Sequence, residues 1–287
     1  MDLEKLFDMV CQSKLIEILS RTIKDGRVIA LIHKYLNAGV INEGKYEETK
    51  VGMPQGGNLS PLLSNSMLNE LDKELDKELE HRGHRFVRYA EDWMIFCKSK
   101  RSAERTLRNI LSFIEGKLKL KVNRNKSKVA HITKVKYLGY SFYITKGEYR
   151  VRVHQKSIDK MKSELKRLTS RSNGGSNAVR KSKLNKFIAG WINYFSKADM
   201  KSMLECMDEW LRRRVRQIYW KQWKKVRTRY KRMKKFGIPL WKVHEMANCR
   251  KATWRAALML NSVLTKEEIA KPGYLSMLGY YTKVCVN

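Results

Sequence analysis

Hydrophobic residues recur at helical spacing through much of the first half of the chain. Between residues 12 and 37, leucine, isoleucine and valine stand three or four positions apart, which predicts a helix. The next apolar run follows a glycine-rich loop, where Ser60 suits a helix N-cap and Pro61 the first helical position. We expect this helix to continue through residue 80, and a further amphipathic helix to begin at a Ser102 cap.

A different pattern marks the segments between these helices. FVRYAEDWMIF, residues 86–96, places two apolar runs rich in aromatic and β-branched residues around Ala90, Glu91 and Asp92. This pattern predicts a hairpin with adjacent carboxylates at its tip. Short strand-like segments follow at VKYLGYSFYI and YRVRV. Helices that alternate with short strands are typical of an α+β domain.

The helix expected after Ser60 contains the sequence LDKE twice in tandem, at residues 71–74 and 75–78. Four residues advance a helix by about 40° beyond a full turn, so a duplication would turn the face that follows it. The alternative is a helix that is simply longer and exposed, and we favour that alternative.

Helical patterns replace the strand signals beyond residue 155. One helix is expected near residues 178–196, after the linker-like segment RSNGGSN. Six of the seven tryptophans lie in this half, and we expect most of them in a core and one or two available to stack on bases. A second helix is marked by a buried stripe of Leu204, Met207, Leu211, Val215 and Ile218.

These patterns divide the chain into three expected parts. Residues 1–150 form an α+β domain, residues 151–245 a helical domain, and residues 246–287 a C-terminal helical extension that is a candidate DNA- or RNA-binding element.

Charge narrows the choice of partner. The 287 residues contain 61 Lys and Arg against 28 Asp and Glu, a formal net charge of +33. A chain this basic repels itself unless it binds a polyanion, so nucleic acid is the first candidate partner and a membrane surface the second. Apolar runs stay well short of the roughly 18 residues of a spanning helix and no signal-like segment is present, so we expect a cytoplasmic protein without a membrane span.

Cysteine and histidine give little sign of a metal site. The five cysteines are scattered and never in C-x-x-C spacing, which is typical of reduced thiols. His81 and His84 stand close together without further ligands at metal-binding spacing, and we interpret them as part of a solvated turn.

The greatest concentration of charge lies at residues 211–235, with thirteen Lys or Arg and no acid. Because no acidic residue balances these cations, we predict that the segment binds the nucleic-acid backbone. Aromatic residues are interleaved among the cations. The candidate RNA-binding residues are Arg212, Arg213, Arg214, Arg216, Lys221, Lys224, Lys225, Arg227 and Arg229.

The carboxylates at the predicted hairpin tip are the main candidates for chemistry. Phosphoryl transfer by a two-metal mechanism holds two divalent ions roughly 3.5–4 Å apart between carboxylates, and magnesium suits such ligands. Glu91 and Asp92 would supply two of them, and Asp2 is the natural third. Their spacing alone does not separate this site from an ordinary acidic turn, because acidic turns are common.

The order of several motifs resembles a known family. DLEKLFD, VGMPQGGNLSPLLSN, RFVRYAEDWMIF, NRNKSKV and YLGY follow one another as the palm motifs of reverse transcriptases do. With LDKELEHRGHRF among them, and GWINYF and DEWLRRRVRQIYWKQWKKVRTRYKRMKKFGIP after them, nearly the whole chain resembles bacterial group II intron reverse transcriptase/maturases. The resemblance implies a partial reverse-transcriptase palm, a small antiparallel sheet with helices, followed by an all-α maturase (thumb) domain.

The resemblance also implies a catalytic role for each acidic candidate. Asp2 matches the first metal-binding aspartate, and Glu91 and Asp92 fall on the two acids of the Tyr-Ala-Asp-Asp box. These three residues would therefore hold two Mg²⁺ ions. Phe7 matches the aromatic gate that excludes a ribose 2′-hydroxyl.

Further positions match residues that handle the nucleotide and the primer. Gln55 and Gly56 lie where the family positions the incoming nucleotide, and Lys126 falls in the lysine motif near nucleotide and template. Leu138 and Gly139 match the primer grip. The alternative for Gln55 is a loop amide, and the alternative for Lys126 is a surface cation. Without the resemblance, we would interpret Leu138 and Gly139 as an ordinary strand with a bend.

Two departures from the family pattern bear on activity. The family's fingers lie upstream of the first catalytic strand, so the position of Asp2 implies an N-terminally truncated chain with the fingers missing. Glu91 replaces an aspartate, and its extra methylene displaces the carboxylate by about 1 Å, which can cost about a hundredfold in a positioned reaction. We therefore expect polymerase activity to be weak or absent, and we expect Glu91→Asp alone not to restore it.

Three functions stay open on this sequence. The first is an active RNA-directed DNA polymerase with maturase function. The second is an RNA-binding splicing module whose catalytic site has decayed. The third is a nonfunctional remnant of a mobile retroelement. We favour a maturase-like protein that binds intron RNA to aid splicing, with target DNA as a further candidate partner. The sequence does not indicate an oligomeric state.

Overall fold

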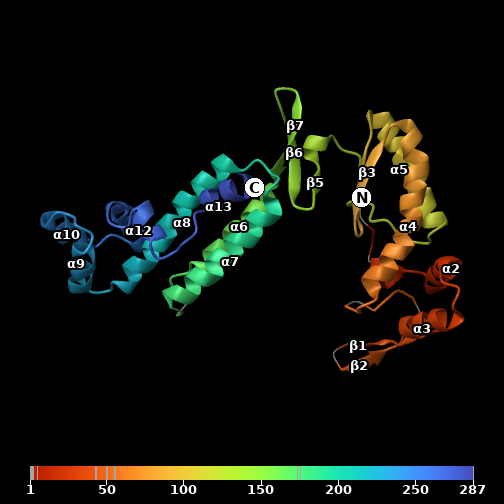
Figure 1. Ribbon diagram of the computed structural model, residues 1–287, viewed down its shortest axis with the longest axis horizontal. Coiled ribbons are helices and arrows are strands. Elements are labelled where there is room, and N and C mark those ends of the chain that lie inside the picture. Colours follow the sequence, from red (N-terminus) through yellow and green to blue (C-terminus); the bar gives the residue numbers. More distant parts are fainter. Residues whose placement is uncertain are drawn as a thin grey trace. The chain divides into compact units, whose positions relative to one another are not determined.

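The structure divides into two compact units, residues 1–131 and residues 132–287. It is a computed structural model that describes residues 3–4, 6–42, 44–49, 51–54, 56–172, 174 and 176–286. Helices predominate and the strands form small antiparallel sheets (Figure 1), which confirms the α+β class. The division falls before the last three strands, whereas the sequence placed the end of the first domain at residue 150.

The first unit combines helices with two hairpins. β1 (Val40–Asn42) pairs with β2 (Lys45–Glu47), and β3 (Arg85–Tyr89) pairs with β4 (Asp92–Phe96). An isolated antiparallel bridge joins Leu3 to Val122. The helices are α1 (Leu6–Met9), α2 (Gln12–Thr22), α3 (Gly26–Asn37), α4 (Ser60–Leu79) and α5 (Lys100–Gly116), with a short 3-10 helix at Glu80–Arg82.

Helix α4 forms the centre of the first core. Its leucines and methionine at four-residue spacing are all 2% exposed or less, namely Leu63, Met67, Leu71, Leu75 and Leu79. The helix is continuous through both LDKE copies. Because four residues advance a helix by only about 40° beyond a turn, Leu71 and Leu75 both stay inside. The leucine of each copy is therefore buried in the core, whereas Asp76 and Lys77 of the second copy are exposed.

Residues 12–37 form two helices, so the prediction of one helix was wrong. Asp25 adopts an extended backbone and its side chain accepts a hydrogen bond from the Arg27 N–H at 2.8 Å, as an N-cap does. The apolar periodicity continues across this interruption, which is why the hydrophobic pattern did not reveal it.

The start of α5 differs from the prediction in its cap. Ser99, not Ser102, is the N-cap, since its side chain accepts a hydrogen bond from the Ser102 N–H at 3.2 Å. The Ser102 hydroxyl instead lies 2.7 Å from Nε2 of His84, which is only 6% exposed. The solvated turn expected for His84 was therefore wrong. Burial lowers the pKa of His84, and the charges of Arg82 and Lys98 lower it further.

The second unit begins with a three-stranded antiparallel sheet, which confirms the predicted strand segments. β5 (Lys136–Tyr137), β6 (Tyr140–Thr145) and β7 (Glu148–Val153) lie in the order β5-β6-β7. The helices that follow are α6 (Gln155–Leu168), α7 (Asn177–Phe195), α8 (Lys201–Gln222), α9 (Val226–Lys234), α10 (Leu240–Ala247), α11 (Thr253–Met259), α12 (Lys266–Ala270) and α13 (Met277–Val286), with 3-10 turns at Ile132–Lys134 and Leu260–Ser262.

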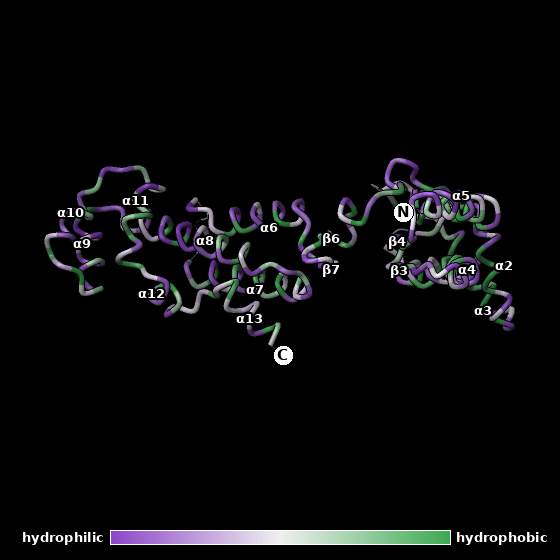
Figure 2. The backbone as a smooth tube through the Cα atoms, turned by 90° about the horizontal axis from the view of Figure 1, so that it is seen from above, coloured by the Kyte–Doolittle hydropathy of each residue, from purple (hydrophilic) through white to green (hydrophobic). Residues whose placement is uncertain are grey.

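The helices of the second unit share one core. The predicted stripe of α8 is confirmed, because its five members are all 4% exposed or less. α11 and α13 pack against α8, and Ala256, Met277 and Tyr281 join the same buried cluster. The buried residues beyond position 245 are thus part of this core. α9 contributes Met233 to it and is hydrophilic along most of its length (Figure 2).

Two further expectations concern membranes and thiols. None of the helices in the described ranges is both long and apolar enough to cross a membrane. All five cysteines are free thiols, as predicted.

A buried carboxylate fixes the C-terminal helix to α8. Asp208 is 5% exposed and accepts hydrogen bonds from the Ser276 hydroxyl at 2.6 Å, the Met277 N–H at 2.8 Å and the Leu278 N–H at 3.2 Å. These amides belong to the first turn of α13, where a negative charge also interacts favourably with the helix dipole. Asp208 therefore caps α13 from a distant helix.

We predict that Asp208→Ala increases local unfolding of α13. Loss of hydrogen bonds to a charged acceptor should destabilise α13 by about 2 kcal/mol, equivalent to roughly 30-fold faster local exchange. Amide hydrogen exchange followed by mass spectrometry on residues 277–286 measures this change. Glu209→Ala is the matched control, because Glu209 is exposed on the same helix. Equal exchange rates in the two variants would contradict the capping role.

Candidate functional site

The predicted hairpin is present, and it carries Glu91 and Asp92 at its tip. β3 and β4 pair so that Tyr89 lies opposite Asp92, and Ala90 and Glu91 form a two-residue turn. Ala90 has a φ of 51°, the left-handed conformation that such tight turns use. Glu91 is half-buried and Asp92 exposed, while the next residue, Trp93, is 1% exposed and anchors the strand in the core.

A clamp from α4 holds this turn in place. The Arg88 Nε donates a hydrogen bond to Asp72 Oδ1 at 2.7 Å, and its Nη2 donates to Oδ2 of the same carboxylate. The Arg88 Nη1 also donates to the Ala90 carbonyl at 3.1 Å and to Asn65 Oδ1 at 3.2 Å. Bidentate arginine–carboxylate pairs are strong and directional. The hairpin tip is therefore fixed to α4 through the first LDKE copy.

The donor chemistry of the tip suits magnesium, but the described ligands are incomplete. Carboxylate oxygens are ligands that Mg²⁺ prefers. In the part of the chain that the structure describes, no group of three or more His, Cys, Asp or Glu side chains is arranged to hold a metal ion. Asp2, the expected third carboxylate, lies outside the described residues. Metal binding by Asp2, Glu91 and Asp92 stays a prediction.

Backbone contacts bring the Phe7 segment against the loop before α4. The Met53 N–H donates to the Phe7 carbonyl at 2.6 Å, and the Gly52 N–H donates to the Val10 carbonyl at 2.8 Å. Gly52 has a φ of 87°, and a Cβ at this position would lie 2.6 Å from the Phe7 carbonyl oxygen. Only glycine allows this approach. Half-buried Phe7 is thus placed beside the segment that leads to Gly56.

A buried amide organises the same loop. The Gln12 side chain is 8% exposed, and its Nε2 donates to the carbonyls of Leu36 at 3.1 Å, Gly52 at 3.0 Å and Thr49 at 3.3 Å. It therefore joins α2, the end of α3 and the loop.

Two of the remaining candidates of the first unit, Gly56 and Lys126, lie in turns. Gly56 is exposed with a φ of 78°, and Gln55 lies outside the described residues. Lys126 is exposed in a turn where its N–H and that of Ser127 donate to the Asn123 carbonyl, at 3.2 and 2.9 Å. Nucleotide contacts by these residues stay predictions.

Leu138 and Gly139 form the tight turn between β5 and β6 in the second unit. Both are left-handed, with φ of 48° and 84°, as a two-residue hairpin turn requires. The Tyr194 hydroxyl donates to the Leu138 carbonyl at 3.0 Å, and the Ser157 hydroxyl donates to the Gly139 carbonyl at 3.1 Å. A Cβ on Gly139 would lie 3.0 Å from the Phe195 ring. The turn is therefore docked on α6 and α7.

Two of the candidate RNA-binding arginines cap helix ends. The Arg214 Nε donates to Thr169 Oγ1 at 2.6 Å, at the end of α6. The Arg229 Nε donates to the Trp223 carbonyl at 2.9 Å, at the end of α8, and its guanidinium lies 4.0 Å from the centre of the Trp220 ring. Cations at helix C-termini satisfy free carbonyls and complement the helix dipole.

Two more arginines hold the segment around α11. Arg213 lies over the Trp254 ring at 3.8 Å and donates to the Trp254 carbonyl at 3.0 Å. Arg216 is 5% exposed and donates to the Leu264 carbonyl at 2.7 Å. Burial lowers the pKa of Arg216.

The nine candidate RNA-binding residues thus separate into two groups. Arg213, Arg214, Arg216 and Arg229 have intramolecular partners and are structural. Arg212 is half-buried, and four cations are exposed, namely Lys221, Lys224, Lys225 and Arg227. RNA binding by this second group stays a prediction.

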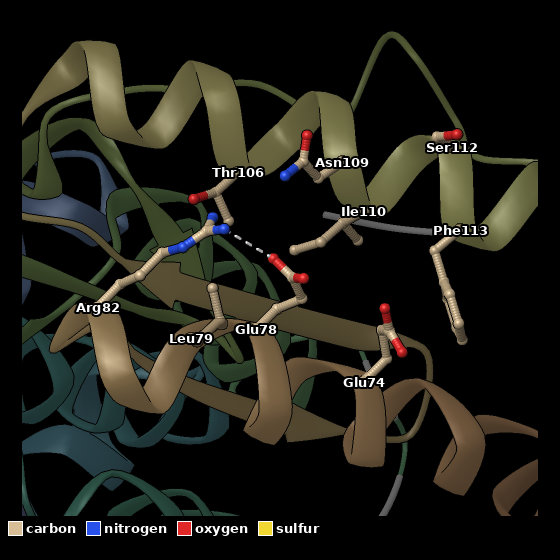
Figure 3. A pocket seen from close by; sticks show the side chains of 9 residues that line it. All are labelled: Glu74, Glu78, Leu79, Arg82, Thr106, Asn109, Ile110, Ser112 and Phe113. Atoms are coloured by element: carbon tan, nitrogen blue, oxygen red, sulfur yellow. Dashed lines mark ion pairs between the residues drawn. The ribbon is translucent and has the colours of Figure 1, made fainter.

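A small cavity of about 250 Å³ lies between α4 and α5 (Figure 3). Glu74 and Glu78, the last residues of the two LDKE copies, line it from α4, and Asn109 and Phe113 line it from α5. Arg82 pairs with Glu78 at 3.1 Å. None of the residues predicted to act in catalysis or binding lines this cavity, so it takes no part in the candidate site.

Sequence reasoning missed the residues that position the site. Arg88 shares a face of β3 with Phe86, so a cation on this inward face was a signal for a buried ion pair. Its partner Asp72 lies on a different element, and nothing in the sequence pairs the two. Gln12 carried no signal, because its acceptors are backbone carbonyls more than 20 residues away.

Two family models match most of this chain. One, described as reverse transcriptase (RNA-dependent DNA polymerase), matches residues 1–142. The other, described as group II intron, maturase-specific domain, matches residues 158–237.

Three curated relatives are similar to parts of the chain. Protein YkfC of Escherichia coli is 30% identical over 161 residues, which cover 46% of this chain and 42% of YkfC. Group II intron-encoded protein LtrA of Lactococcus lactis is 43% identical over 70 residues, 24% of this chain and 12% of LtrA. An uncharacterized 91 kDa protein in the cob intron of Schizosaccharomyces pombe is 47% identical over 70 residues, 24% of this chain and 9% of that protein. The chain therefore spans less than half the length of these relatives.

We predict that Arg88→Ala loosens the hairpin tip. Loss of hydrogen bonds that involve a charged donor should destabilise the hairpin by about 2 kcal/mol. Arg85→Ala, an exposed position on the same strand, is the control and should change stability by less than about 0.5 kcal/mol. Amide exchange of residues 85–96 distinguishes the two variants. Unchanged protection in Arg88→Ala would show that the clamp does not hold the turn.

Proposed function

The chain belongs to the family of group II intron reverse transcriptases and maturases, and we propose that it binds intron RNA through its second unit to assist splicing. The observation that carries the proposal is the coincidence of two features. The maturase-specific match covers residues 158–237, and the exposed cations Lys221, Lys224, Lys225 and Arg227 lie within it. A relative of this chain, LtrA, is named a group II intron-encoded protein.

The separation of the basic residues into structural arginines and exposed cations supports this proposal. Arg214 and Arg229 hold the ends of α6 and α8, so the segment that carries the exposed cations is fixed before any RNA binds. A prepositioned set of charges loses less entropy on binding than a flexible tail does. Backbone phosphates would then take the place of the carboxylates that this segment lacks.

A second function, RNA-directed DNA polymerisation, is favoured by the first unit. The observation that supports this second function is the hairpin tip, where Arg88 and Asp72 fix the turn that presents Glu91 and Asp92. We propose that residues 1–150 form a palm, which includes the strands β5 and β6 and the start of β7, and that the helices of residues 151–245 form a thumb. Magnesium bound by Asp2, Glu91 and Asp92 would neutralise charge on the phosphates during transfer.

Glu91 is the reason to expect weak polymerase activity. A glutamate reaches about one methylene farther than an aspartate, and displacements of about 1 Å can cost about a hundredfold. The Arg88 clamp fixes the backbone of the turn, so the backbone has little freedom to compensate for the longer side chain.

For RNA binding we predict a strong dependence on salt. Neutralisation of about six phosphates of a single strand should give a slope of log K against log salt near −4. Replacing three exposed cations by glutamine should reduce the slope by about 0.7 for each phosphate that is no longer neutralised. The variant carries Lys221→Gln, Lys224→Gln and Arg227→Gln.

The control removes the same charge from α5. Its three substitutions are also at exposed positions, Arg101→Gln, Arg105→Gln and Arg108→Gln. Fluorescence anisotropy with the cognate intron RNA and with an unrelated RNA gives both slopes. Equal slopes in the two triple variants would mean that the charge acts without a defined site, and a slope near zero in the wild type would overturn RNA binding itself.

For polymerisation we predict that Asp92→Ala abolishes any primer extension that the wild type shows on an RNA template with magnesium. The carboxylate is required as a metal ligand, so the loss should be at least about a hundredfold. Asp76→Ala, an exposed acid on α4, is the control. Extension that survives Asp92→Ala would show that the chemistry lies elsewhere, and RNA binding that survives it separates the two functions.

A further inference from the structure

One tryptophan is much more exposed than all others in the described chain. Trp241, at the start of α10, is 70% exposed, whereas Trp93, Trp220 and Trp223 are 7% exposed or less. The half-buried tryptophans lie against other side chains: Trp191 packs on Phe195, Trp210 lies under Arg214 and Trp254 under Arg213. Trp241 makes no hydrogen bond or ring contact with another described residue.

The position of Trp241 follows from how α10 packs. Val243, Met246 and Ala247 are buried and form the face of α10 that joins the core. Trp241 lies about 160° around the helix from that face at about 100° per residue, so its indole points to solvent. α10 packs beside α9 (Figure 1). An exposed indole is thus held on a rigid element and not on a loop.

The segment that contains Trp241 is strongly basic. Residues 224–251 contain eleven Lys or Arg and one acid, Glu245. On α9, next to α10, the cations of Arg227, Lys231 and Lys234 are exposed. Aromatic rings presented among cations bind nucleobases by stacking while the cations neutralise phosphates.

We propose that Trp241 stacks on an unpaired base of a single-stranded nucleic acid whose backbone is neutralised by the exposed cations of α9. The proposal rests on the proposed RNA-binding function and adds that this surface recognises bases that are not paired. A duplex offers phosphates but no free base face, so only a single strand uses both features of the surface. An anionic membrane surface, which also attracts cations and tryptophan, is the competing ligand.

The test uses the full chain and two labelled RNAs. One is a single-stranded oligouridine about 12 nucleotides long and the other a duplex of the same length, a size within the range of stacking surfaces. Trp241→Ala should weaken binding of the single strand about tenfold, since one stacked base contributes roughly that much, and should leave its salt slope unchanged. Trp241→Phe keeps an aromatic face and should recover most of the affinity.

The controls separate stacking from other effects. Leu240→Ala removes apolar surface from a neighbouring residue that is 53% exposed but has no π face, and it should change binding less than twofold. Duplex binding should be the same in the wild type and in Trp241→Ala. Because Trp241 is exposed, the thermal unfolding curve should not move.

Each other outcome overturns the inference in a distinct way. Single-strand binding by Trp241→Ala equal to that of the wild type removes the stacking role. An equal loss on duplex and single strand removes the preference for unpaired bases. Binding to vesicles of anionic phospholipid that depends on Trp241, with RNA binding unchanged, assigns the surface to a membrane. A wild type that binds neither RNA overturns the proposed function itself, and the inference with it.

Discussion

Guanidinium groups that donate to backbone carbonyls and lie on indole rings hold the helical unit together. The chain has 61 basic and 28 acidic residues, so carboxylates cannot neutralise most of its cations. Arg213, Arg214, Arg216 and Arg229 instead use neutral partners, and three of them lie over tryptophan rings. Planar guanidinium suits this environment better than ammonium, because it is more weakly hydrated and has donors in fixed directions.

Scarcity of acids gives individual carboxylates particular roles. Buried Asp208 accepts hydrogen bonds from the first turn of α13. Half-buried Asp72 accepts hydrogen bonds from Arg88 and so fixes the hairpin tip. In each unit a carboxylate thus joins elements that are far apart in sequence. Structural cations and structural acids are both used inside the units, and the cations that are left over face solvent, where a polyanion can reach them.

The elements that local periodicity determines were predictable, and those that depend on distant partners were not. The α8 stripe, the long α4 and the hairpin at Glu91 and Asp92 follow from spacing within one segment. The break at Asp25 did not, because a cap interrupts the backbone without interrupting the apolar pattern. His84 was misjudged since its partner Ser102 is 18 residues away and its burial depends on α5.

Prediction of the candidate site was limited in the same way, by dependence on partners that are distant in the sequence. The order of motifs pointed to Asp2, Phe7, Glu91 and Asp92 through family resemblance, but two of the predicted positions, Asp2 and Gln55, lie outside the described residues. The charge run at residues 211–235 located the concentration of cations. It did not separate structural from exposed arginines, because their carbonyl acceptors stand 41 to 48 residues away in cases such as Arg213 and Arg216. Only the folded chain makes that separation.

The tandem LDKE in α4 has a consequence for how this gene tolerates changes in length. Four codons keep the reading frame, and four residues return a helix nearly to the same face, so both leucines of the repeat are buried. An insertion of one or two residues would rotate the following apolar positions by about 100° or 200° and expose them. A change in length by one four-residue unit therefore disturbs the buried face of α4 less than a change by one or two residues.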